Sequence, residues 1–170
     1  METLKKYNLE EEEDKLFSFL LLMADEQNNF LRVANALDYR LTNPQSTESL
    51  EELERYIREQ NLNFKDPSDE ALNERTNCWY YLGEVVRINY GGGWEFSMNE
   101  ENTANWGNYV IEGHCSVAGV EFEPLGIVRN FIANGYPAGA LRRAIMADIA
   151  DEEDFLADLP TETDPNAPAA

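Results

Sequence analysis

The alternation of hydrophobic and polar positions predicts a helical first half, followed by a short region of strands. Glu11 to Asp14 open the first predicted helix, over residues 10–40, because acids are favourable at the positive end of the helix dipole. Its apolar residues recur at roughly helical spacing and are Leu16, Leu20, Met23, Phe30, Val33, Ala34 and Leu37. Four more widen this face: Phe17, Phe19, Leu21 and Leu22. We therefore expect this helix to be wedged between neighbouring elements rather than to lie on the surface.

A second, shorter helix is expected after the helix-breaking run LTNPQS. It begins at Ser46 or Thr47, ends near Gln60 and carries a narrow apolar stripe, which predicts a surface helix. Glu54 and Arg58 have the spacing and order of a favourable i,i+4 ion pair on it.

The window 77–94, NCWYYLGEVVRINYGGGW, is the most apolar and aromatic part of the chain and predicts a central core helix. Ser68 is its expected N-cap, because a serine hydroxyl can accept a hydrogen bond from the first helical turn. Gly83 costs about 1 kcal/mol relative to alanine in a helix, so its expected use is the close approach of another element. Gly91 to Gly93 end the helix, since glycine readily takes the left-handed conformation. The apolar stripe of this helix includes Leu72, Trp79, Leu82 and Val86.

From Trp94 the period changes to alternation, which is typical of strands with one buried face. Strands are predicted at 94–98, at 106–112 and from Cys115 to Phe122, the last interrupted at Gly119, and together they form a small antiparallel meander.

Two helices, from Pro124 to Gly135 and over residues 138–150, complete the predicted domain. The expected fold class is α+β: one domain over residues 1–155, with helices packed on the antiparallel β-meander. Residues 156–170 are acidic and rich in proline and alanine, and we expect this tail to be disordered.

Charge narrows the possible partners. The chain has 33 acidic and 13 basic residues, a formal net charge of −20. Such a charge repels nucleic-acid phosphates and anionic membranes and attracts basic partners. We therefore expect no direct nucleic-acid binding and no membrane binding. The alternative is that the acidity serves only solubility.

The cysteines and the amino-terminal sequence predict a cytoplasmic protein. Cys78 and Cys115 lack CxxC spacing and are expected to be small buried residues in a reducing compartment. The apolar run from Leu16 to Ala24 is too short to span a bilayer and has no small-residue cleavage site.

Candidate catalytic residues are few. His114 is the only histidine, and Cys115 beside it would point to the opposite face of a strand, so a Cys–His dyad is disfavoured and His114 is interpreted as structural. Glu84 is expected to pair with Arg87 or to cap a backbone group rather than to act as a general acid or base. No catalytic residue, metal site or cofactor is predicted.

Candidate partner-binding residues are acidic or aromatic. Trp94 and Trp106 are candidates for an aromatic binding platform, although a core position is the favoured interpretation of both. The densest acidic patch of the chain lies near its carboxyl end. The predicted partner-binding set is Glu95, Trp106, Asp148, Asp151, Glu152, Glu153, Asp154 and Asp158.

Two segments, YYLGEVVRINYGGGWEF at 80–96 and VEFEPLGIVRNFIANG at 120–135, together resemble a pattern of uncharacterised bacterial proteins. Those proteins are similar to immunity proteins of polymorphic or contact-dependent toxin systems. The matching residues are of structural type and are Gly83, Glu84, Gly91 to Gly93, Trp94 and Pro124. With the acidity, the resemblance implies a non-enzymatic immunity protein that binds a cognate toxin with a basic surface. The alternatives are a structural or adaptor protein of a phage or secretion system and, third, an enzyme that uses Glu84 or His114.

Overall fold

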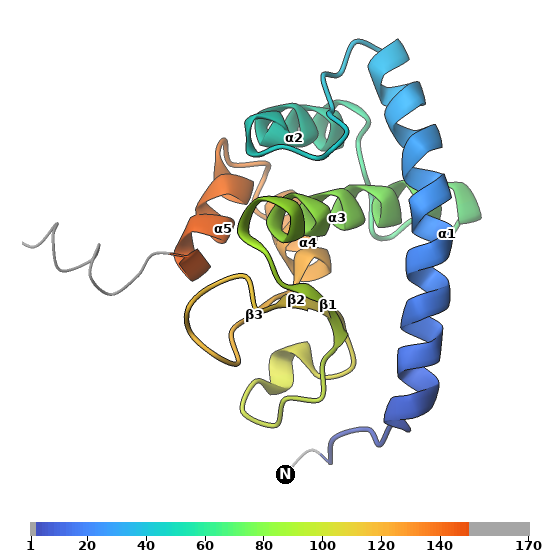
Figure 1. Ribbon diagram of the computed structural model, residues 1–170. Helices are drawn as coiled ribbons and strands as arrows, with labels where there is room; N and C mark the ends of the chain where they lie inside the picture. The colour runs from blue at the N-terminus through green and yellow to red at the C-terminus, as the bar shows by residue number, and fades with distance from the viewer. Residues whose placement is uncertain (1–2, 150–170) are drawn as a thin grey trace, which may run out of the picture.

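A long buried helix and a small antiparallel sheet form the centre of the molecule (Figure 1). The structure is a computed structural model and describes residues 3–149. Its helices are α1 (Leu9–Ala36), α2 (Leu50–Glu59), α3 (Asp69–Tyr90), α4 (Pro124–Ala133) and α5 (Ala140–Ile149). Its strands are β1 (Gly93–Phe96), β2 (Tyr109–Glu112) and β3 (Glu121–Phe122), and 3-10 turns lie at Thr47–Ser49 and Thr103–Asn105. The predicted α+β class is confirmed. None of the helices within residues 3–149 has the length and apolar character needed to cross a bilayer.

The sheet has the order β1-β2-β3 with both pairs antiparallel. Trp94 lies opposite Ile111, and Ile111 lies opposite Phe122, so one buried row crosses all three strands. Trp94 packs in this row against α3, where its ring stacks on that of Tyr80 with centroids 5.3 Å apart. Residues of the alternate register, such as Glu95, lie on the opposite face.

Helix α3 forms as the sequence predicts. Its first turn is capped by Ser68, whose Oγ accepts a hydrogen bond from the Ala71 amide at 3.2 Å. Every residue from 77 to 86 is buried, and Gly91, with φ of 93°, ends the helix. Leu72 departs from the predicted core stripe: it is exposed, because the first turns of α3 extend beyond the elements that cover its centre.

Gly83 and Glu84 together hold Trp94. The indole lies so close to the α3 backbone that a methyl group at Gly83 would overlap its Cη2 and Cζ2 atoms, which confirms the predicted close approach. Glu84 accepts hydrogen bonds from Trp94 Nε1 at 2.8 Å and from Arg87 Nη2 at 2.7 Å. The predicted pairing of Glu84 with Arg87 is thus confirmed.

Several predicted boundaries are wrong. Helix α1 ends at Ala36 rather than near residue 40, because Asp38 takes a left-handed φ of 69°. The second strand begins only at Tyr109, since residues 103–105 form a 3-10 turn that leads into Trp106.

The third predicted strand is mostly absent from the described chain. Gly113 and Gly119 take φ values of 84° and 78°, which turn the backbone on both sides of residues 115–117. Only the two residues of β3 join the sheet. The predicted tail at 156–170 lies outside the described residues.

Glu54 has a different partner from the predicted one. It is 4% exposed, and its carboxylate accepts hydrogen bonds from the backbone amides of Gly139 at 2.9 Å and Leu141 at 3.0 Å, not from Arg58. A carboxylate at a helix amino terminus satisfies donors that have no partner within the helix. Glu54 therefore fastens the beginning of α5 to α2.

Replacing Glu54 with alanine is expected to lower the free energy of unfolding by about 2 kcal/mol, because two backbone amides lose a charged acceptor. Urea denaturation of the purified protein measures the change. Glu48→Ala is the control, since this acid lies in the 3-10 turn just before α2 and its side chain is exposed. Equal effects of the two substitutions would contradict the role assigned to Glu54.

Candidate protein-binding surface

The three most exposed large apolar side chains of α1, which we call the α1 patch, are Phe17, Leu21 and Leu22. Their exposed fractions are 64%, 58% and 58%. The prediction that they are wedged between neighbouring elements is wrong. Helix α1 buries only the opposite face, which packs against α3 and β1, and it lies along one side of the molecule (Figure 1). Among residues 3–149, nothing covers the α1 patch.

Acidic side chains flank this patch at both of its ends along the helix. Phe17 and Leu21 are four residues apart and so lie on the same side of the helix. The exposed acids Glu10 and Asp14 precede them by one to two turns, and Asp25 follows one turn later. An exposed apolar cluster with a charged rim is typical of a protein-binding surface.

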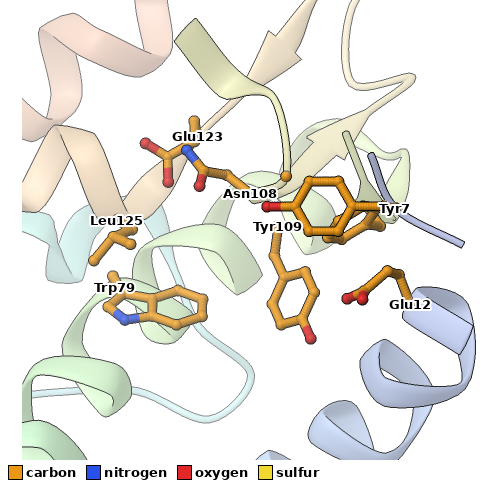
Figure 2. Close-up of a pocket in the computed structure, with 9 residues that line it drawn as sticks. Tyr7, Glu12, Trp79, Asn108, Tyr109, Glu123 and Leu125 are labelled. Atoms are coloured by element: carbon orange, nitrogen blue, oxygen red, sulfur yellow. The ribbon is translucent and has the colours of Figure 1, made fainter. Parts of the chain in front are cut away.

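A second feature, the aromatic pocket, lies near the amino-terminal end of α1 (Figure 2). It has a volume of about 270 Å³ and is lined by Tyr7, Glu12, Trp79, Phe96, Gly107, Asn108, Tyr109, Glu123 and Leu125. Its walls come from the segment before α1, from α1 and α3, from β1, from β2 and the loop before it, and from the start of α4. Figure 2 shows the carboxylates of Glu12 and Glu123 on different sides of the pocket, with Tyr109 between them.

The aromatic pocket depends on how the segment before α1 is held. Trp106 Nε1 donates a hydrogen bond to the Lys5 carbonyl oxygen at 2.8 Å. Tyr7 then packs edge-on against Phe96 with ring centroids 5.0 Å apart and covers Gly107. Trp106, a predicted partner-binding residue, is half-buried and positions this wall.

Of the other predicted partner-binding residues, the structure describes Glu95 and Asp148, which have different neighbours. Glu95 is exposed on the sheet, where partial burial, and then the carboxylates of Glu112 and Glu13, raise its pKa above the ordinary value. Asp148 contacts the buried His114 instead, with Oδ2 3.2 Å from Nε2. Partial burial raises the pKa of Asp148, against the lowering effect of the His114 contact. The remaining acids lie outside the described residues: Asp151, Glu152, Glu153, Asp154 and Asp158.

His114 lies inside the molecule next to β3. Its side chain is fully buried, and the ring lies edge-on to Phe122 with centroids 6.0 Å apart. Cys115 directs its thiol to the Val117 carbonyl oxygen at 3.5 Å rather than to the imidazole. Within residues 3–149, no group of three or more histidine, cysteine or acidic side chains is placed to hold a metal ion.

Both features were missed by the sequence analysis. The α1 patch had a signal, since apolar residues occur on more than one face of a helix that also carries many acids. That signal was interpreted as a wider buried face. The aromatic pocket had no local signal, because its walls come from segments far apart in the sequence.

Comparison with known proteins gives no match: no protein-family model fits the chain, and none of the curated proteins or solved structures is similar to it. The resemblance of residues 80–96 and 120–135 to immunity proteins therefore stays a hypothesis.

Proposed function

We propose that this protein is a cytoplasmic, non-enzymatic immunity protein that binds and neutralises a cognate bacterial toxin with a basic surface. The observation that carries the proposal is the exposed α1 patch, flanked by acidic side chains. The net charge of −20 supports a basic partner, since complementary charge accelerates association and selects against acidic surfaces. The sequence resemblance supports the same class of partner.

In this proposal the acidic residues and the apolar residues of the surface have different roles. The acids around the α1 patch draw in the substrate-binding surface of the toxin, where its positive charge is concentrated. Phe17, Leu21 and Leu22 then lose their contact with water, and burial of a large apolar side chain contributes up to about 1.5–3 kcal/mol. Buried apolar anchors set the dissociation rate, whereas the charged rim sets the association rate.

The proposal is tested by co-expression with the products of the adjacent genes. We expect one of them to be toxic alone, to co-purify with this protein, and to bind the F17A/L21A/L22A variant at least about thirtyfold more weakly, with loss of protection. The matched control is L72A/V117A/M146A, which removes three apolar side chains that are exposed elsewhere. Thermal denaturation should show both variants folded.

Two results would overturn the proposal: no adjacent gene product binds, or the α1 variant protects as well as the control does. A homo-oligomer that depends on the α1 patch would point instead to the structural or adaptor alternative.

A further inference from the structure

We propose that the aromatic pocket receives an arginine side chain from the basic partner. This inference rests on the proposed function for its partner and adds the chemical group that is recognised. An arginine guanidinium is a planar cation that stacks on aromatic rings and donates several hydrogen bonds in one plane. The aromatic pocket offers rings for stacking and acidic acceptors for those donors.

The aromatic side chains of the pocket are fixed by packing against a further ring, that of Phe19. Phe19 of α1 stacks on Trp79 with centroids 5.4 Å apart and an interplanar angle of 13°. The same ring contacts Tyr109 at 5.1 Å. Because Trp79 is itself buried in α3, these rings cannot rearrange freely. One of the lining rings already contacts a cation, since Lys5 Nζ is 4.7 Å from the Tyr7 ring centroid.

Glu123 supplies an acceptor that lacks a donor. Its Oε2 accepts the Gly126 amide at 2.6 Å and so caps α4. Its Oε1 is inaccessible to solvent and has no hydrogen-bond partner among the described residues. Burial raises the pKa of this carboxyl above the ordinary glutamate value. A guanidinium in the aromatic pocket reaches Oε1 when the carboxyl group turns toward it, and the new hydrogen bond would satisfy Oε1 and stabilise the ionised form, since buried polar atoms are normally hydrogen-bonded.

Glu12 supplies a second acceptor on another side of the pocket (Figure 2). It already pairs with Lys15, whose Nζ is 2.8 Å from Oε1, but the Lys15 side chain is 62% exposed. The Glu12 side chain is 15% exposed, and an arginine in the aromatic pocket would share its carboxylate with Lys15.

The volume and the charge of the aromatic pocket favour an arginine side chain over a cofactor or a lysine side chain. A volume of about 270 Å³ lies below the usual range for cofactors and drug-sized ligands, so a single side chain is the better fit. Carboxylates on two sides favour a cation, and acceptors that lie apart favour the forked guanidinium over the compact ammonium of lysine.

The test is an NMR titration of the full protein with N-acetyl-arginine methylamide. The control ligand is the citrulline analogue, which has the same shape and no charge. We expect saturable shifts of the Trp79 Nε1–H, Gly107 and Gly126 signals, with a roughly millimolar dissociation constant for arginine and at least tenfold weaker binding of citrulline. Equal binding of the two ligands, or shifts that do not saturate, would overturn the inference.

Two variants separate the pocket from the general acidity. Glu123→Gln keeps an oxygen for the Gly126 amide but removes the charge, and we expect about tenfold weaker arginine binding. Glu95→Gln removes one exposed charge outside the pocket and should leave the titration unchanged. Equal effects of the two variants would mean that only net charge attracts arginine, against the inference.

This titration is independent of the toxin. If an adjacent gene product binds through the α1 patch but the pocket ignores arginine, the inference fails and the proposed function stands. If arginine binds and no gene product does, the pocket is real and the proposed function fails.

Discussion

Replacing Gly92 with alanine is expected to lower the free energy of unfolding by about 4 kcal/mol. Gly92 has a φ of 82°, which strains any residue with a Cβ atom. A methyl group there would also overlap the Glu112 carbonyl oxygen and approach the His114 amide to 2.9 Å. Both atoms belong to backbone, so relief requires β2 to move away from the turn before β1. Urea denaturation followed by fluorescence measures the loss.

Two other glycines separate the cost of the left-handed backbone at Gly92 from the cost of the steric overlap. At Gly93 a methyl group would have no neighbour within 4 Å and φ is not positive, so Gly93→Ala should change stability by less than about 0.5 kcal/mol. Gly119 has a φ of 78° and open space, so Gly119→Ala should show the backbone strain alone, about 1–2 kcal/mol. If Gly92→Ala were no worse than Gly119→Ala, the clash with β2 would be refuted.

Gly83→Ala is expected to destabilise the protein by about 3 kcal/mol, although alanine is the better helix former by about 1 kcal/mol. The reason is the overlap of the new methyl group with Trp94, whose ring cannot retreat. It is stacked on Tyr80, crossed by Trp79 at a centroid distance of 6.0 Å, and hydrogen-bonded to Glu84. Chemical denaturation of the single variant gives the magnitude.

A double-mutant cycle with Trp94→Phe isolates this contact, because phenylalanine lacks the outer atoms of the indole. In that background, Gly83→Ala should be neutral or should stabilise the protein by up to about 1 kcal/mol. A similar loss in both backgrounds would show that the steric conflict lies elsewhere.

The elements with strong local signals were predicted well. Helix α3 has a capping serine, a continuous buried stretch and a glycine stop, and each acts within a few residues. The role of Gly83 could also be inferred, because a glycine in a core helix needs a reason beyond helix propensity.

The features that the sequence did not predict depend on contacts between distant segments of the chain. The sequence shows that Phe17 and Leu21 are apolar and lie on one side of a helix. Only the arrangement of the neighbouring elements shows that nothing described covers them. Strands as short as β3 lack the length that alternation needs to be recognised. Glu54 has the sequence context of a surface acid, and its two amide donors lie 85 and 87 residues further along the chain.

The contact between Glu54 of α2 and the beginning of α5 limits how far the chain can be shortened. A chain that ends before Gly139 would lose both donors of the Glu54 carboxylate. It would also lose the Leu141 and Ile145 side chains, which are buried in the core, and would expose the apolar residues that they contact. Helix α5 is therefore an integral part of the domain, and a minimal version of this protein has to extend at least through Ile149.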